Sequence, residues 1–72
     1  MRLAFEEAEA AAARGEVPVG AVITNASGQV IARAGNRTLE RKDPTAHAEM
    51  LAIRDAAVAL SSERLTDCDL YV

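Results

Sequence analysis

The chain has 72 residues, a net charge of −3 and a 50% hydrophobic composition, which predicts one small globular unit with a thin core. Its acidity argues against indiscriminate nucleic-acid binding, and no stretch approaches the roughly 18–20 apolar residues of a membrane span. The one cysteine, Cys68, allows no intrachain disulfide, so we expect a reducing, cytoplasmic compartment. Because no apolar stretch is long enough to span a bilayer, we expect no membrane partner.

Residues 2–14 predict a first helix, because Ala, Glu and Arg are strong helix formers and small apolar residues recur there at helical spacing. Gly15 stands where a helix ends in a left-handed residue. Residues 17–24 are apolar, β-branched or small, which is typical of a strand covered on both faces. A turn composition at residues 25–28 and a second apolar stretch at 29–34 then predict a hairpin.

Residues 35–42 are polar and predict a loop. A second long helix is expected over residues 46–60. Asp43 or Thr45 can cap it, and Pro44 suits its first turn. The apolar residues at helical spacing that we expect to form its buried stripe are Met50, Ile53, Ala57 and Leu60.

Residues 67–72 alternate in polarity and predict a third strand, in which Cys68 is interpreted as a buried structural residue and not as a metal ligand. The order of elements is therefore α-β-β-α-β. A strand–helix–strand crossover joins parallel strands with a right-handed turn, so we expect the third strand to run parallel to a strand of the hairpin. Both helices should then pack on the sheet.

The segment DPTAHAE, residues 43–49, contains the only histidine, His47, two residues before Glu49. Either residue alone is more often structural or solvated than functional. Together, after a Pro-containing turn, they match the first half of the His-x-Glu…Pro-Cys-x-x-Cys signature of zinc deaminases. Positions i and i+2 lie about 200° apart on a helix, so His47 and Glu49 can serve one site only beyond the helix N-terminus.

Longer segments resemble the zinc-dependent cytidine/deoxycytidylate deaminase superfamily, and most of all the bacterial tRNA-specific adenosine deaminases. In order along the chain, they are EVPVGAV at 16–22, Asn36-Arg37, DPTAHAEMLAIR at 43–54, Leu65-Thr66 and Leu70-Tyr71-Val72. This resemblance implies a cytidine-deaminase-like three-layer α/β/α sandwich. Residues 1–72 would form a truncated deaminase domain that lacks the C-terminal Pro-Cys-x-x-Cys half.

The resemblance also implies roles for individual residues. His47 would be a ligand of a catalytic Zn²⁺, and Glu49 would move protons during catalysis. Asn36 would hydrogen-bond the nucleoside, and Ala48 would present its backbone to the base. The implied activity is hydrolytic deamination of adenosine to inosine in the anticodon loop of tRNA, by a homodimer.

Two other functions stay open, because DPTAHAE is also similar to bacterial guanine deaminases. The protein could act on a free base such as guanine or cytosine, or it could be a non-catalytic half-domain that binds a partner. A catalytic zinc needs three protein ligands, and this sequence offers one. We therefore expect the isolated chain to be inactive, either as a truncated enzyme or as one half of a split enzyme whose partner chain supplies the cysteine ligands.

Four of the eight basic residues gather within ten positions, at Arg33, Arg37, Arg41 and Lys42. Such a cluster is either a solvated loop or a phosphate-contacting patch. In the second case, Arg37 and Arg41 are the candidate RNA contacts.

Overall fold

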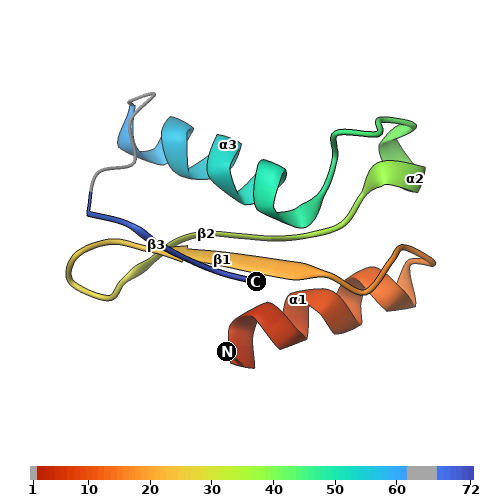
Figure 1. The fold of residues 1–72 in the computed structure, drawn as a ribbon, viewed down its shortest axis with the longest axis horizontal. Helices are drawn as coiled ribbons and strands as arrows, with labels where there is room; N and C mark the ends of the chain where they lie inside the picture. Colours follow the sequence, from red (N-terminus) through yellow and green to blue (C-terminus); the bar gives the residue numbers. More distant parts are fainter. Residues whose placement is uncertain (1, 62–66) are drawn as a thin grey trace.

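The computed structural model describes residues 2–61 and 67–72, which form three layers (Figure 1). The elements in chain order are α1 (Arg2–Ala13), β1 (Gly20–Thr24), β2 (Val30–Gly35), α2 (Thr38–Arg41), α3 (Ala48–Leu60) and β3 (Asp69–Tyr71). Helix α1 covers one face of the sheet and α3 the other, which confirms the predicted α/β/α sandwich. Leu65 and Thr66 lie outside the described residues. Among the described residues, no helix combines the length and hydropathy needed to cross a bilayer.

Helix α1 ends in the way that its sequence predicts. Gly15 has a φ of 84°, and its N–H donates to the carbonyl of Ala12 at 3.0 Å. The N–H of Glu16 donates to the carbonyl of Ala11 at 2.9 Å. These two bonds make a Schellman motif, which satisfies the last helical carbonyls and turns the chain toward β1.

Strand β1 is the centre of a sheet with the order β2-β1-β3. All five of its residues are buried, because helices lie on both faces, and this confirms the prediction. Strands β1 and β2 form the predicted antiparallel hairpin. The Oδ1 atom of Asn25 accepts from the N–H groups of Ser27 and Gln29, and Gly28 has a φ of 81°, so the turn is specified locally.

Strand β3 runs in the same direction as β2, because both are antiparallel to β1. That shared direction is what the predicted crossover requires. The hydrogen-bonded neighbour of β3, however, is β1, so its own ladder is antiparallel. The crossover through α3 passes over β1, because α3 packs on β1 as well as on β2. Cys68 is half-buried and packs against the core, as predicted.

Helix α3 begins two residues later than predicted. The Oδ1 atom of Asp43 accepts from the N–H of Thr45 at 2.8 Å and from its hydroxyl at 2.7 Å. The N–H of Ala46 donates to the carbonyl of Asp43 at 3.0 Å. This local turn competes with the helix for the same backbone groups, so Pro44 lies in the turn and α3 starts at Ala48.

The predicted buried stripe of α3 is wrong. Met50, Ile53 and Leu60 are 39%, 37% and 40% exposed. Ala57 is only half-buried. The buried side chains of this helix are instead Ala48, Leu51, Ala52 and Ala56. They face a sheet surface that is itself made of small residues, including Ala21, Ala32 and Ala34. Small side chains on both sides let the two layers approach closely, so alanine and not the larger apolar residues marks the contact.

Helix α1 sits on two glycines that face each other across β1 and β2, Gly20 and Gly35. A Cβ atom at Gly20 would clash with the backbone of Ala4 and Ala8. At Gly35 it would lie 2.7 Å from the carbonyl oxygen of Glu7. The backbone of α1 therefore rests directly on the backbone of the hairpin.

Candidate active site

The N-terminus of α3 carries the one histidine of the chain. His47 is the N-cap residue, with an extended backbone (φ −76°, ψ 152°), and its carbonyl accepts from the N–H of Leu51 at 3.0 Å. Its side chain is exposed and makes no hydrogen bond or ion pair with the residues that the structure describes. The imidazole therefore has both ring nitrogens available to a ligand.

Glu49 lies in the first turn of α3 and is half-buried. His47 stands outside the helix in extended conformation, so the roughly 200° separation of an i, i+2 pair on a regular helix wall does not apply to His47 and Glu49. Both belong to the N-terminus of α3, which is the arrangement that the motif requires. Unpaired N–H groups and the positive end of the helix dipole favour negative charge at such a position.

Asn36 joins the end of β2 to the start of α3. It is only 3% exposed, and its Oδ1 atom accepts from the N–H of Ala48 at 2.8 Å. Its own N–H donates to the carbonyl of Val19 at 3.1 Å. The next residue, Arg37, donates its N–H to the carbonyl of Ala46 at 2.9 Å. These contacts bring Asn36 and Ala48 together beside His47 and Glu49.

The hydrogen bond between Asn36 and Ala48 determines which of their polar groups can still bind a substrate. The N–H of Ala48 is already bonded to Asn36, and Ala48 is fully buried, so a substrate contact through this N–H would have to share or displace that bond. The Nδ2 atom of Asn36 has no partner among the described residues and remains a donor. Substrate binding by Asn36 and Ala48 stays a prediction.

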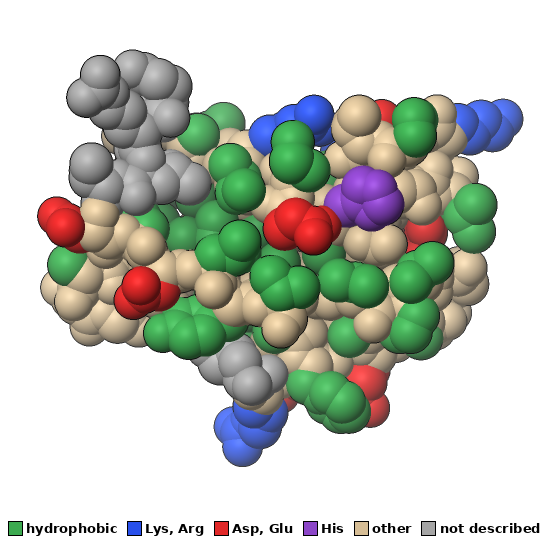
Figure 2. Space-filling view, in the orientation of Figure 1, with side chains coloured by type: hydrophobic (Ala, Val, Ile, Leu, Met, Phe, Trp, Pro, Cys, Tyr) green, Lys and Arg blue, Asp and Glu red, His purple; other side chains and the backbone are tan. Residues whose placement is uncertain are grey.

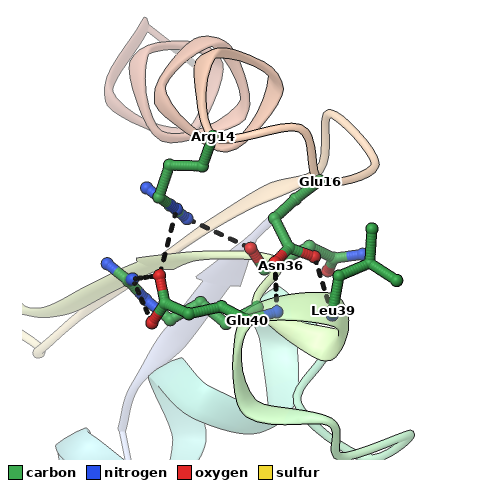
Figure 3. Close-up of polar contacts among 6 residues, drawn as sticks. Arg14, Glu16, Asn36, Leu39 and Glu40 are labelled. Atoms are coloured by element: carbon green, nitrogen blue, oxygen red, sulfur yellow. Dashed lines mark hydrogen bonds and ion pairs between the residues drawn. The ribbon is translucent and has the colours of Figure 1, made fainter.

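Sequence reasoning assigned no role to Glu16, whose side chain is almost completely buried, with 6% exposure. The N–H groups of Leu39 and Glu40 donate to its carboxylate at 3.0 and 2.8 Å (Figure 3). Burial raises the pKa of Glu16, but these backbone hydrogen bonds and the charge of Arg14 lower it more, so the pKa lies below its ordinary value.

Glu16 supplies the cap that α2 lacks locally. Arg37, at the N-cap position of α2, makes no capping side-chain bond, and Leu39 and Glu40 are the second and third residues of this four-residue helix. A loop was predicted here. The helix forms because a carboxylate that precedes it by 23 and 24 residues accepts from its amides.

The basic cluster is divided in the structure. Arg33 pairs with two acidic side chains of α1, at 2.6 and 3.3 Å. Arg37 pairs with Glu40 at 2.9 Å. Arg41 and Lys42 are exposed and make no ion pair with the described residues. Of the two candidate RNA contacts, Arg37 is therefore already neutralised by a neighbour and Arg41 is not.

The part of the chain that the structure describes provides only part of a zinc site. Within residues 2–61 and 67–72, no three His, Cys, Asp or Glu side chains lie close enough together to hold a metal ion. The exposed imidazole of His47 suits one coordination position. Cys68 packs against the core. The described residues therefore offer one ligand and a nearby carboxylate, whereas a catalytic zinc takes three protein ligands.

The protein-family model for the cytidine and deoxycytidylate deaminase zinc-binding region matches residues 1–72 of the sequence. The chain is 57% identical over 72 residues to a tRNA-specific adenosine deaminase of Agrobacterium fabrum, covering 100% of this chain and 47% of that protein. A structure from a study of A-to-I editing by tRNA:A34 deaminases superposes with a TM-score of 0.94 at 56% identity, covering 99% of this chain and 54% of the other. Guanine deaminase from Bacillus subtilis superposes with a TM-score of 0.91 at 41% identity, covering 97% and 45%. The chain thus spans about half the length of the curated relatives it matches.

Proposed function

Because the chain belongs to the cytidine and deoxycytidylate deaminase zinc-binding family, we propose that it provides part of the active site of an enzyme that converts adenosine to inosine in tRNA. The observation that carries the proposal is the cluster at the N-terminus of α3, where His47 and Glu49 lie beside the bonded pair of Asn36 and Ala48. The 57% identity to the tRNA-specific adenosine deaminase of A. fabrum, against 41% to a guanine deaminase, favours tRNA over a free base.

Zinc is the cofactor of this proposal. His47 would hold it together with ligands from outside the described residues, supplied by the complete protein or by a partner chain. When bound, zinc supplies a Lewis acid that lowers the pKa of a coordinated water. Without those further ligands, the described residues do not make a complete catalytic centre, and we expect the isolated chain to be inactive.

Glu49 is the residue that moves protons in this proposal. Deamination consumes one water and one adenosine and releases ammonia and inosine, so protons must leave the water and reach the ring nitrogen and the departing amino group. A carboxylate can accept and then donate a proton within one catalytic cycle. Glu49 lies in the first turn of α3, next in the chain to Ala48, which Asn36 holds in place.

Asn36 would orient the nucleoside. Its Oδ1 atom is fixed by the N–H of Ala48, so the direction of its Nδ2 donor is fixed as well. A donor that is held in place before the substrate arrives loses little entropy on binding. Arg41, which is exposed and makes no ion pair with the described residues, is the better placed of the two candidate phosphate contacts.

We also propose that the enzyme is a homodimer. Helix α3 exposes large apolar side chains at Met50, Ile53 and Leu60. On the face of the molecule shown in Figure 2, hydrophobic side chains gather around the histidine. Large exposed apolar side chains gathered on one face are characteristic of protein–protein contacts. The mass of the complete protein in solution, measured by light scattering, tests the dimer.

The central experiment measures inosine formed in tRNA by the full-length protein that carries this segment, loaded with zinc. Glu49→Gln should lower the rate at least on the order of 100-fold, the size of a lost general acid–base contribution, while zinc content and folding are retained. His47→Ala should lower zinc content as well. Glu9→Gln, on the exposed side of α1, is the control for a lost carboxylate.

Two results would contradict the proposal. Activity that survives Glu49→Gln would remove the assigned proton carrier. If the protein deaminated free guanine but not tRNA, its substrate would be the free base of the alternative function.

A further inference from the structure

We propose that Glu16 is a positioning residue of the active site, whose carboxylate holds α2 so that Asn36 stays locked to the N-terminus of α3. The catalytic part of this inference rests on the proposed function. The geometric part rests on the contacts of Glu16, Asn36 and Ala48 alone.

The first step is that Glu16 is itself held firmly. Its backbone N–H closes the Schellman motif at the end of α1 by donating to Ala11. Its carboxylate is buried and accepts two backbone N–H groups. Bonds to an ionised acceptor are roughly twice as strong as bonds between neutral groups. Glu16 therefore connects α1 to α2 through bonds that water reaches poorly.

The second step is that α2 depends on this carboxylate. Helix α2 has four residues, buries none of them and receives no side-chain cap at Arg37. So short a helix is not stable by its own propensity. The two bonds from Leu39 and Glu40 to Glu16 are thus a principal restraint on its position.

The third step connects α2 to the site. Asn36 lies two residues before the start of α2 and bonds the first residue of α3. Arg14, also at the end of α1, donates from Nη2 to the backbone carbonyl of Asn36 at 3.1 Å and lies 3.9 Å from Glu40. Figure 3 shows Arg14 and Glu16 reaching from the end of α1 to the two sides of this segment. Only Arg37 separates Asn36 from α2, so a displacement of α2 would pull on Asn36 against its bonds to Arg14, Val19 and Ala48, and would disturb the direction of its Nδ2 donor.

Glu16→Gln tests the inference in the full-length, zinc-loaded protein. Glutamine keeps the size of the side chain but replaces one acceptor oxygen by an NH₂ group, which would oppose the N–H of Leu39 or Glu40. We expect KM for tRNA to rise on the order of tenfold with a smaller change in kcat, because misplacing a binding group by about 1 Å can cost up to 100-fold. Zinc content should not change. Glu9→Gln removes an equal charge from the same region and should leave both constants as they are.

A double-mutant cycle separates positioning from a general loss of stability. If Glu16 acts through Asn36, then Glu16→Gln should add little to the KM of an Asn36→Ala protein. The same fold-increase in both backgrounds would overturn the inference, and so would a lower melting temperature with an unchanged KM. If Glu16→Gln does not fold, Glu16→Asp, which keeps both acceptor oxygens, serves for the same cycle.

A nuclear magnetic resonance arm decides the geometric part without any activity. The side-chain NH₂ signals of Asn36 and the amide signal of Ala48 should shift in Glu16→Gln and stay in place in Glu9→Gln. Unmoved signals would refute the positioning role. A wild-type protein that deaminates nothing would instead refute the proposed function, and the resonance data would still decide the role of Glu16.

Discussion

The substitution Asn36→Ala should destabilise the protein more than its loss of one hydrogen bond suggests. Asn36 is 3% exposed and Ala48 is fully buried, so the N–H of Ala48 has no access to water once the Oδ1 atom of Asn36 is removed. A buried donor left without an acceptor costs about 1–3 kcal/mol of unfolding free energy. That is a large share of the roughly 5–15 kcal/mol that separates native from unfolded states.

Asn25→Ala is the matched control, because it is the same change of side chain at a half-buried position whose side-chain hydrogen bonds are exposed. Asn25 makes more side-chain hydrogen bonds than Asn36, to Ser27 and Gln29, but all of them lie in the exposed hairpin turn. Water can replace them, so we expect a loss of only about 0.5–1.5 kcal/mol. The order of the two effects therefore follows burial and not the number of bonds.

Denaturant unfolding of the full-length variants measures both free energies, and hydrogen exchange at the amide of Ala48 provides the local measurement. In Asn36→Ala this amide should exchange roughly 5- to 150-fold faster, which is the same 1–3 kcal/mol expressed as an equilibrium constant. In Asn25→Ala its exchange should rise by no more than roughly 2- to 13-fold, which is the equivalent of the smaller loss of about 0.5–1.5 kcal/mol. The reasoning fails if the amide of Ala48 stays equally protected in Asn36→Ala, or if Asn25→Ala is the more destabilising variant.

Three further predictions follow from packing and charge. Leu51→Ala should cost about 2–5 kcal/mol, whereas Val58→Ala, whose side chain on α3 is 79% exposed, should cost less than about 0.5 kcal/mol, as measured by denaturant unfolding. Gly20→Ala should lower the unfolding free energy by at least about 1–3 kcal/mol, because its Cβ would clash with the backbone of α1. At Gly15 nothing lies within 4 Å of an added Cβ, so Gly15→Ala should cost only the roughly 1 kcal/mol of placing alanine in a left-handed conformation. The folded-state pKa of Glu16 is below its ordinary value of 4.5, so its stabilisation is complete above that pH and is lost as the pH falls through the folded pKa. The melting temperature of Glu16→Gln should therefore fall less steeply than that of wild type between neutral pH and pH 3, and parallel curves would contradict this.

The elements that could be predicted from sequence are those specified by neighbouring residues. Gly15 ends α1, and Asn25 and Gly28 make the hairpin turn, because each acts on backbone groups within five positions of itself. The His47-x-Glu49 pair was recognised for the same reason, since the whole motif lies within a few residues of the start of α3. Local signals of this kind survive folding because tertiary contacts reinforce them.

What could not be predicted depends on residues far apart in the chain. Helix α2 is capped by the carboxylate of Glu16, and a local sequence pattern cannot predict a cap that lies more than twenty positions away. Which face of α3 is buried depends on the alanines of the facing sheet. The periodicity of the helix sequence alone contains no information about that sheet. The bond from Asn36 to Ala48 joins two residues that sequence reasoning had assigned separately to the substrate.

The glycine pair beneath α1 limits how this protein can change during evolution. In an ordinary core, a larger residue at one position can be offset by a smaller one at its neighbour, because total volume is conserved. Gly20 and Gly35 face main-chain atoms of Ala4, Ala8 and Glu7, and no substitution can make main-chain atoms smaller. A lineage that loses either glycine has no compensating substitution at the contact itself, and can recover only by moving the whole helix.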